Sequence, residues 1–242
     1  VSMLPGEGQV PHRGDVEVTP FIYSAPMDTV TGYELTKEML AARAYPVVSR
    51  FIDKDEIIQC METFSGDNNM FFAVPIDIAQ INDFIGTWRA VRHSSDDKIN
   101  LAIDIAHGDM KLAQETYNYL RIHPDVNFIM SGSICTTEAA CRAVAHGCTH
   151  LRVGVGPGAA CTTRIMTGIG APNLSAVYRI AEKIRNLHTN KHRATKVIAD
   201  GGIKEPGDAA KYLAAGADGI MLGSVLSKTE ESYGWEETEF VM

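Results

Sequence analysis

Short apolar runs alternate with longer amphipathic segments along most of the chain. Runs rich in β-branched and aromatic residues that end in small or polar residues predict eight strands, at Phe21–Pro26, Tyr45–Phe51, Met70–Ile76, Ile99–Ala106, Asn127–Ser133, His150–Gly156, Lys196–Gly202 and Gly219–Ser224. Most are separated by segments with helical spacing and mixed charge, such as Gly32–Ala44, Lys54–Thr63, Gly108–Ile122, Thr136–His146, Ala176–Leu187 and Pro206–Ala215. A strand that alternates with a helix eight times predicts an α/β fold, the parallel (β/α)8 TIM barrel.

The chain length agrees with one such barrel. A TIM barrel takes roughly 250 residues, and the chain has 242, of which about eighteen follow the last predicted strand. We therefore expect the eighth helix to be largely absent from this sequence. Since linkers, low-complexity tracts and repeats other than the β/α unit are missing, we expect a single barrel domain over residues 1–242.

The excess of acidic residues limits the kinds of partner that the protein can bind. The chain has 22 Lys and Arg against 30 Asp and Glu, a formal net charge of −8, which argues against nucleic acid but leaves room for a small local anion site. No stretch approaches the ~20 apolar residues of a membrane span, and the first residues lack a signal-peptide core. We expect a cytoplasmic protein with no membrane partner.

The glycine-rich ends of strands seven and eight are the first candidate site. Strand seven ends in Asp200-Gly201-Gly202 and strand eight in Leu222-Gly223-Ser224. In TIM barrels these two loops commonly bind phosphate, because small residues let backbone N–H groups approach an anion. Asp200 is suited to accept hydrogen bonds from ribose hydroxyls. The alternative is that the glycines merely permit tight turns, but two such loops in the expected places favour a phosphate site.

The loop after strand six leads from Gly154 directly to Cys161. A thiol at a barrel mouth can attack an electrophilic carbon, and nearby N–H dipoles favour the thiolate. Bent glycine backbone also turns carbonyls inward, where they could bind a monovalent cation. The five cysteines include no CxxC pair, and the eight histidines show no metal-binding spacing. We expect a reactive role for Cys161 alone.

The other cysteines have simpler interpretations. Cys60, Cys141 and Cys148 fit the usual role of a free cysteine as a small buried hydrophobe. Cys135 precedes Thr136 and Thr137, one of which should cap a helix, so we interpret Cys135 as a bystander.

Strand four ends in Asp104, followed by Ile105, Ala106 and His107. The Asp104 carboxylate is suitably placed to hold the ribose of a hydride-accepting cofactor. The alternative roles are that Asp104 orients its loop by accepting backbone N–H groups and that His107 is only a surface turn residue.

Seven strings spread over about 200 residues carry a family resemblance. They are Ser24-Ala-Pro-Met-Asp-Thr-Val30, Asp104-Ile-Ala-His-Gly108, Gly154-Val-Gly-Pro-Gly158, Cys161-Thr-Thr-Arg164, Thr167-Gly-Ile-Gly170, Ile198-Ala-Asp-Gly-Gly-Ile203 and Met221-Leu-Gly-Ser224. In content and order they resemble the IMP dehydrogenase/GMP reductase family.

The resemblance implies an oxidoreductase acting on a purine 5′-monophosphate. It implies that Cys161 adds to purine C2, that hydride moves between this carbon and a nicotinamide, and that Thr163 assists the attacking water or leaving ammonia. It implies the remaining roles by residue: substrate contacts from Ser24, Met27, Asp200, Gly202, Gly223 and Ser224; cofactor contacts from Asp104 and Gly154; and potassium binding by the carbonyls of Gly156, Gly158 and Cys161. Family members are also homotetramers.

Two branches of the family run this chemistry in opposite senses, IMP oxidation with NAD⁺ and GMP reduction with NADPH. The segment after Cys161 favours the dehydrogenase, since Ile165-Met166 stands where reductases usually carry lysine. Only a short stretch separates Phe51 from Asp104, which leaves no room for the regulatory CBS domains usual in dehydrogenases. We expect IMP oxidation, with GMP reduction and a catalytically incomplete nucleotide-binding barrel as alternatives.

Several positions depart from the family pattern. Ala159 stands where serine is usual, which removes one phosphate hydroxyl, and Ser131-Gly-Ser133 replaces the usual Gly-Asn. The mobile flap that carries the dehydrogenase's Arg-Tyr base or the reductase's catalytic Glu has no counterpart before Met242.

Overall fold

Eight parallel strands form the centre of the molecule. The structure, a computed structural model, describes residues 21–158, 161–187 and 195–234. The strands are β1 (Ile22–Ser24), β2 (Val47–Val48), β3 (Phe71–Val74), β4 (Ile99–Ile103), β5 (Val126–Ile134), β6 (His150–Val153), β7 (Lys196–Asp200) and β8 (Gly219–Leu222). They pair in the order β1-β8-β7-β6-β5-β4-β3-β2, and a parallel bridge between Tyr23 and Tyr45 joins the two ends. The predicted TIM barrel is confirmed.

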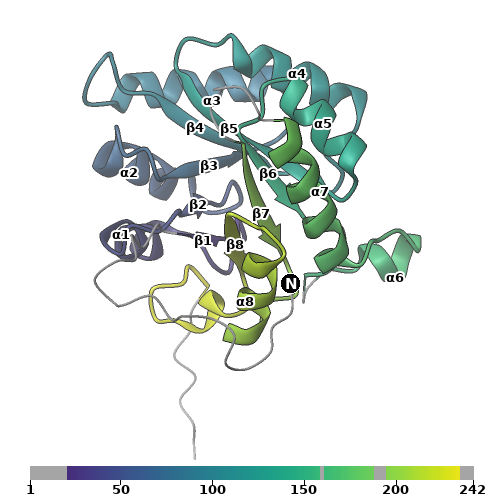
Figure 1. Ribbon diagram of the computed structural model, residues 1–242. Coiled ribbons are helices and arrows are strands. Elements are labelled where there is room, and N and C mark those ends of the chain that lie inside the picture. The colour runs from purple at the N-terminus through teal and green to yellow at the C-terminus, as the bar shows by residue number, and fades with distance from the viewer. Residues whose placement is uncertain (1–20, 159–160, 188–194, 235–242) are drawn as a thin grey trace, which may run out of the picture.

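Helices surround the strands (Figure 1). They are α1 (Tyr33–Ala41), α2 (Lys54–Phe64), α3 (Ile78–Val91), α4 (Lys111–Arg121), α5 (Thr137–Ala145), α6 (Thr163–Thr167), α7 (Asn173–Leu187) and α8 (Pro206–Ala214), and a 3-10 turn at Leu226–Lys228 follows β8. All six predicted helices are present. As predicted, the Thr136 hydroxyl caps α5, by accepting a hydrogen bond from Ala139 N.

Helix α3 is the main element that the sequence interpretation did not name. Its buried residues Ile81, Ile85 and Trp88 have helical spacing, and the Asp77 carboxylate caps its first turn by accepting from the N–H groups of Ala79 and Gln80. The sequence therefore does contain the helical spacing and the capping residue from which α3 could have been predicted. Helix α6, five residues long, is too short to show a periodicity.

Aromatic and aliphatic side chains fill the barrel interior. Tyr23, Phe71, Met130, Ile198 and Met221 belong to one buried cluster contributed by five different strands. The Tyr23 and Tyr45 rings stack with centroids 4.5 Å apart, and the His150 ring meets the Phe71 ring edge-on at 4.9 Å. Because this packing fills the interior, the barrel offers a ligand space at its mouth rather than in its centre.

A charged cluster lies at the opposite, amino end of the barrel. Asp125 precedes β5 and accepts hydrogen bonds from Arg89 Nε at 2.7 Å and Arg92 Nη1 at 2.8 Å. Burial alone would raise the pKa of Asp125, but the two guanidinium groups hold it below its usual value. The pair of cations thus fixes the end of α3 to the start of β5.

In the described ranges, no helix combines the length and the apolar character needed to cross a bilayer.

Candidate active site

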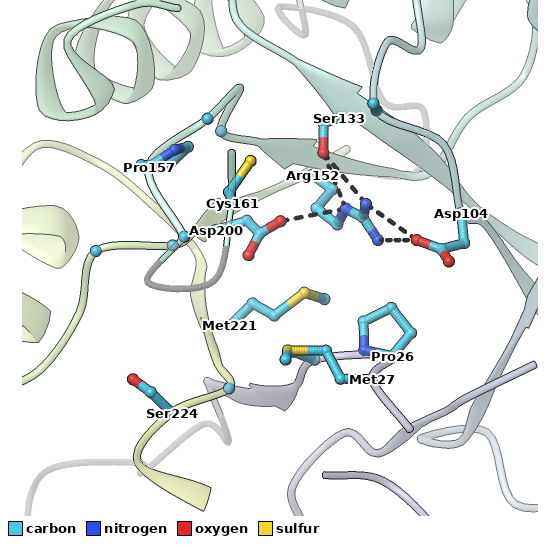
Figure 2. Close-up of a pocket in the computed structure, with 18 of the residues that line it drawn as sticks. Pro26, Met27, Asp104, Ser133, Arg152, Pro157, Cys161, Asp200, Met221 and Ser224 are labelled. Atoms are coloured by element: carbon cyan, nitrogen blue, oxygen red, sulfur yellow. Dashed lines mark hydrogen bonds and ion pairs between the residues drawn. The ribbon is translucent and has the colours of Figure 1, made fainter. Parts of the chain in front are cut away.

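A cavity of about 790 Å³ opens at the carboxyl ends of the strands. Figure 2 shows its lining residues. All the predicted site residues except Ser24 line it, namely Met27, Asp104, Gly154, Gly156, Gly158, Cys161, Thr163, Asp200, Gly202, Gly223 and Ser224. Ser24 is fully buried instead, and its hydroxyl accepts a hydrogen bond from Val47 N at 3.0 Å. This contact joins β1 to β2, and the substrate role of Ser24 stays a prediction.

The loop after β7 has a backbone that only glycine adopts easily. Gly201 and Gly202 have φ values of +87° and +77°. A Cβ atom on Gly201 would lie 2.8 Å from Pro157 Cγ, so this loop also packs closely on the loop after β6. Among the described residues the N–H groups of Gly202 and Ser224 have no hydrogen-bond partner. They remain available to an anion in the cavity.

Asn173 secures this loop from behind. The buried Asn173 side chain donates to the Asp200 carbonyl at 2.9 Å and lies 3.1 Å from the Tyr212 hydroxyl. A buried amide with these partners fixes the backbone at the end of β7. Sequence analysis did not identify Asn173, because its position at the start of α7 gives no hint that it reaches across to β7.

Cys161 is the one cysteine of the five that lines the cavity. Its backbone N–H donates to the Gly158 carbonyl at 3.0 Å, and its thiol donates to the Thr163 hydroxyl, with Sγ and Oγ1 3.3 Å apart. Helix α6 begins at Thr163. The turn thus presents a half-buried thiol and a hydroxyl side by side at the mouth of the barrel.

The other cysteines lie away from this cavity. Burial raises the pKa of the Cys60 thiol to about 12 and that of Cys148 well above its usual value. Burial, with Asp109 nearby, also raises the pKa of the half-buried Cys135. Cys60 and Cys148 are buried as expected, but Cys141 is only half-buried, in a second pocket beside Arg142 and Lys183, so the expectation of burial is wrong for this cysteine. The expectation that Cys135 is a bystander agrees with this placement.

An ion-pair network crosses the upper side of the cavity (Figure 2). Arg152, on β6, lies between Asp104 and Asp200. Its Nη1 is 3.2 Å from Asp104 Oδ1, and its Nε is 3.3 Å from Asp200 Oδ2. The Ser133 hydroxyl is 3.2 Å from Arg152 Nη2, and Asp104 Oδ2 accepts from Arg50 Nε at 3.4 Å. Arg152 thus links residues from β4, β5, β6 and β7.

Sequence analysis missed both arginines. A signal existed for Arg152, because a cation in the otherwise buried strand His150–Val153 needs a buried partner. Burial raises the pKa of Asp200, and Arg152 opposes this rise while Asp104 adds to it. Arg152, on the neighbouring strand β6, therefore holds Asp200, the predicted ribose acceptor, in place.

Three residues that the sequence analysis considered, His107, Ile165 and Met166, do not line the cavity. His107 is exposed, which agrees with the interpretation as a surface turn residue. The neighbouring Asp109 accepts from Arg142 Nε at 2.7 Å, which ties the loop after β4 to α5, and this hydrogen bond lowers the pKa of Asp109. Ile165 and Met166 are 84% and 77% exposed and do not line the cavity.

The donor atoms expected for potassium are compatible with a hard cation, since all are carbonyl oxygens. Within the described residues, Gly156, Gly158 and Cys161 stand on one tight loop, and the Gly158 carbonyl also accepts the Cys161 N–H. In the part of the chain that the structure describes, no group of three or more His, Cys, Asp or Glu side chains is placed to hold a metal ion. Ala159 and residues 1–20 lie outside the described ranges.

The fold and this cavity define a TIM-barrel protein with a cysteine-bearing loop and two further glycine-rich loops at one mouth. Comparison with known sequences agrees: a family model for the IMP dehydrogenase / GMP reductase domain matches residues 9–239. The chain belongs to this family of oxidoreductases.

Named relatives come from both branches. The chain is 43% identical over 140 residues to inosine-5′-monophosphate dehydrogenase of Bacillus subtilis (strain 168), an alignment that covers 57% of this chain and 27% of that protein. It is 42% identical over 136 residues to GMP reductase of Leishmania donovani, covering 55% of this chain and 26% of that protein. The matched region thus spans about a quarter of each relative, and identity does not separate the branches.

Proposed function

We propose that this chain forms the catalytic barrel of an enzyme that converts IMP, NAD⁺ and water to XMP, NADH and a proton. The observation that carries the proposal is the placement of Cys161 in one cavity with Asp200 and the two glycine loops. This arrangement offers a nucleophile, a ribose acceptor and an anion site to one ligand, which is what a purine 5′-monophosphate requires.

In the proposed reaction the Cys161 thiolate adds to C2 of IMP. NAD⁺, when bound, would accept the hydride from C2, and a thioimidate would remain on Cys161. Water then adds to the same carbon, and XMP leaves as the Cys161 thiolate is restored. Thr163 would assist this water, and the 3.3 Å distance between its hydroxyl and the Cys161 sulfur supports that role.

The glycine loops hold the substrate phosphate in this proposal. Within the part of the chain that the structure describes, the N–H groups of Gly202 and Ser224 have no partner, so both could donate to the phosphate. Gly223 stands between the end of β8 and Ser224. The Asp200 carboxylate accepts hydrogen bonds from the ribose hydroxyls. Met27 and Met221 face Arg152 across the cavity and offer an apolar surface to the purine (Figure 2).

The part of the cavity around Asp104 suits the cofactor. Asp104 and Gly154 would contact the nicotinamide ribose, and Asp104 is held there by Arg50 and Arg152. The carbonyls of Gly156, Gly158 and Cys161 would bind potassium and so stabilise the cysteine loop. Removing potassium is expected to lower turnover.

GMP reduction with NADPH is the second candidate. Relatives named GMP reductase match at nearly the same identity as those named dehydrogenase. The exposed positions of Ile165 and Met166 also weaken the sequence argument, because these side chains do not reach the cavity. Arg50 provides a cation in the cavity that a cofactor phosphate could use.

A paired assay decides the direction. We expect purified full-length protein to form reduced nicotinamide from IMP and NAD⁺, with more signal when potassium is added. Consumption of NADPH with GMP, and no signal with IMP, would establish the reductase instead. Tight nucleotide binding without either reaction would mean a catalytically incomplete barrel. We further propose a homotetramer, and sedimentation of an active monomer would exclude it.

A further inference from the structure

A pair of buried polar side chains lies directly behind the glycine loop that follows β7. Asn173 begins α7 and Tyr212 belongs to α8, and both residues are 8% exposed. Asn173 Nδ2 is 3.1 Å from the Tyr212 hydroxyl. Neither of these two residues lines the cavity. Any effect of the pair on a ligand must therefore pass through the backbone that it contacts.

Both side chains contact carbonyl groups of the loop. Asn173 Nδ2 donates to the Asp200 carbonyl at 2.9 Å and lies 3.4 Å from the Gly201 carbonyl oxygen. The Tyr212 hydroxyl accepts from Asn173 and donates its own proton to the same Gly201 oxygen, at an oxygen–oxygen distance of 3.5 Å. Two donors from two different helices thus converge on the Gly201 carbonyl.

The direction of the Gly201 carbonyl fixes the direction of the Gly202 N–H. The two groups belong to one peptide unit, and in a planar trans peptide the C=O and the N–H point in opposite directions. With its oxygen turned toward α7 and α8, this peptide turns the Gly202 N–H the other way, toward the cavity. Gly201 and Gly202 both line that cavity, and within the described residues this N–H has no partner.

Glycine on both sides of this peptide gives it little resistance to rotation. Gly201 and Gly202 have φ values of +87° and +77°, and without a Cβ atom each can also adopt other backbone conformations. A half turn of the peptide would aim the Gly201 carbonyl oxygen at the cavity, where it would repel an anion. The side chains behind the loop oppose this rotation, because it would take the acceptor away from the buried Tyr212 hydroxyl.

We propose that Asn173 and Tyr212 are positioning residues, which hold the Gly201–Gly202 peptide with its N–H toward the cavity and thereby set the affinity for the substrate's phosphate. The inference rests on the proposed function, since it takes the bound anion to be the phosphate of a purine 5′-monophosphate. Tyr212 acts on the phosphate alone, whereas Asn173 also holds the backbone of Asp200.

The test is calorimetric titration of the full-length protein with IMP and inosine, which differ only in the phosphate. Tyr212→Phe keeps the buried ring and removes only the hydroxyl. We expect this variant to bind IMP about fivefold more weakly and inosine as well as the wild type does, the range for one lost hydrogen bond. Asn173→Ala should reduce the preference for IMP by about tenfold, because it removes the donor that both carbonyls share.

Tyr117→Phe is the matched control. Tyr117 is also buried, and its hydroxyl also donates to a glycine carbonyl beyond a strand end, that of Gly108 at 3.3 Å, but neither residue lines the cavity. This variant should keep the preference for IMP over inosine. Denaturant unfolding should show similar losses of stability in Tyr117→Phe and Tyr212→Phe, so a difference in preference reports positioning rather than a general loosening of the fold.

Combining Tyr212→Phe with Asn173→Ala tests whether the two residues act on one peptide. If they do, the loss of preference in the double variant is smaller than the product of the two single losses. Independent, multiplying losses would contradict the shared role. If Asn173→Ala does not fold, Tyr212→Phe and its control still decide the proposal.

The outcomes separate this inference from the proposed function. A wild type that prefers IMP to inosine, with a Tyr212→Phe variant that keeps the full preference, would overturn the role of the pair and leave the proposed function intact. An equal loss of preference in Tyr117→Phe, or an equal loss of inosine binding in Tyr212→Phe, would also overturn it, since the effect would then be general. A wild type that binds neither IMP nor GMP would overturn the proposed function and this inference with it.

Discussion

The two ends of the barrel pair arginine with aspartate in different ways. At the amino end one carboxylate, Asp125, is shared by Arg89 and Arg92, with distances of 2.7 and 2.8 Å. At the carboxyl end one guanidinium, that of Arg152, is shared by Asp104 and Asp200, with distances of 3.2 and 3.3 Å. The pKa of Asp125 is lowered, whereas burial raises that of Asp200.

This difference indicates two purposes. At the amino end the acceptor is saturated, so its hydrogen bonds contribute to folding stability. At the mouth Arg152 is shared by two carboxylates. Asp104 has a second partner in Arg50, and one oxygen of Asp200 is left for a ligand. We therefore expect substitutions at the mouth to change binding or turnover, and substitutions at the amino end to change stability.

The largest effect is expected from Cys161→Ala at the mouth. It should abolish turnover, because no thiol remains to add to the purine, while nucleotide affinity and melting temperature change little. Activity assays together with calorimetry check this. Cys141→Ala, on the outside of α5, is the control and should keep activity. Loss of turnover in Cys135→Ala with Cys161→Ala active would refute the assignment.

Removing the 5′-phosphate from the ligand is expected to have the next largest effect, on binding affinity. Inosine should bind about a hundredfold more weakly than IMP, because charge-assisted hydrogen bonds from backbone N–H groups to the phosphate are lost. Calorimetry with both ligands measures the ratio. Equal affinities would exclude an anion site at Gly202 and Ser224.

A matched pair of neutral substitutions compares the two ends directly. Asp200→Asn should weaken IMP binding by about tenfold and leave the stability nearly unchanged. Asp125→Asn should lower the free energy of unfolding by about 2 kcal/mol, because two arginines lose a charged partner, and should leave IMP affinity unchanged. Denaturant unfolding and calorimetry on both variants test the comparison, which fails if the two effects are reversed.

The pH dependence of stability sharpens the same contrast. The folded pKa of Asp125 is depressed, so its stabilising contribution is present above about pH 4, the unfolded value, and is lost as the pH falls through the folded pKa. Asp125→Asn should therefore lose less stability on acidification than the wild type. The raised pKa of Asp200 has the opposite sign, so Asp200→Asn should lose more. Melting temperatures between neutral and acidic pH distinguish the two.

The smallest effect concerns two glycines near one another in sequence. Gly202→Ala should cost about 1 kcal/mol, because its φ of +77° is unfavourable for alanine, and should weaken phosphate binding. Gly207, within α8, has open space where a Cβ would lie, so Gly207→Ala should be neutral or slightly stabilising. Thermal melting of both variants is the measurement.

The sequence by itself determined the barrel and most of its site. Alternating strand and helix patterns predicted all eight strands, because each element carries its own periodicity in a local segment. The residues Cys161, Asp200 and Gly202 were found in the same way, since the carboxyl ends of parallel strands meet at one mouth whatever the detailed packing.

Only the tertiary structure decided which charges pair and which side chains face inward. Arg152 meets Asp104 and Asp200 across 48 residues in both directions along the chain, and no local pattern encodes such a contact. Ser24, the last residue of β1, is buried, and its hydroxyl accepts a hydrogen bond from Val47 N that its sequence string did not predict. Ile165 follows Cys161 closely in sequence yet points to solvent, because α6 leads the chain away from the barrel (Figure 1). Ion pairing and side-chain direction depend on how distant strands are brought together, which is a property of the closed barrel rather than of any one segment.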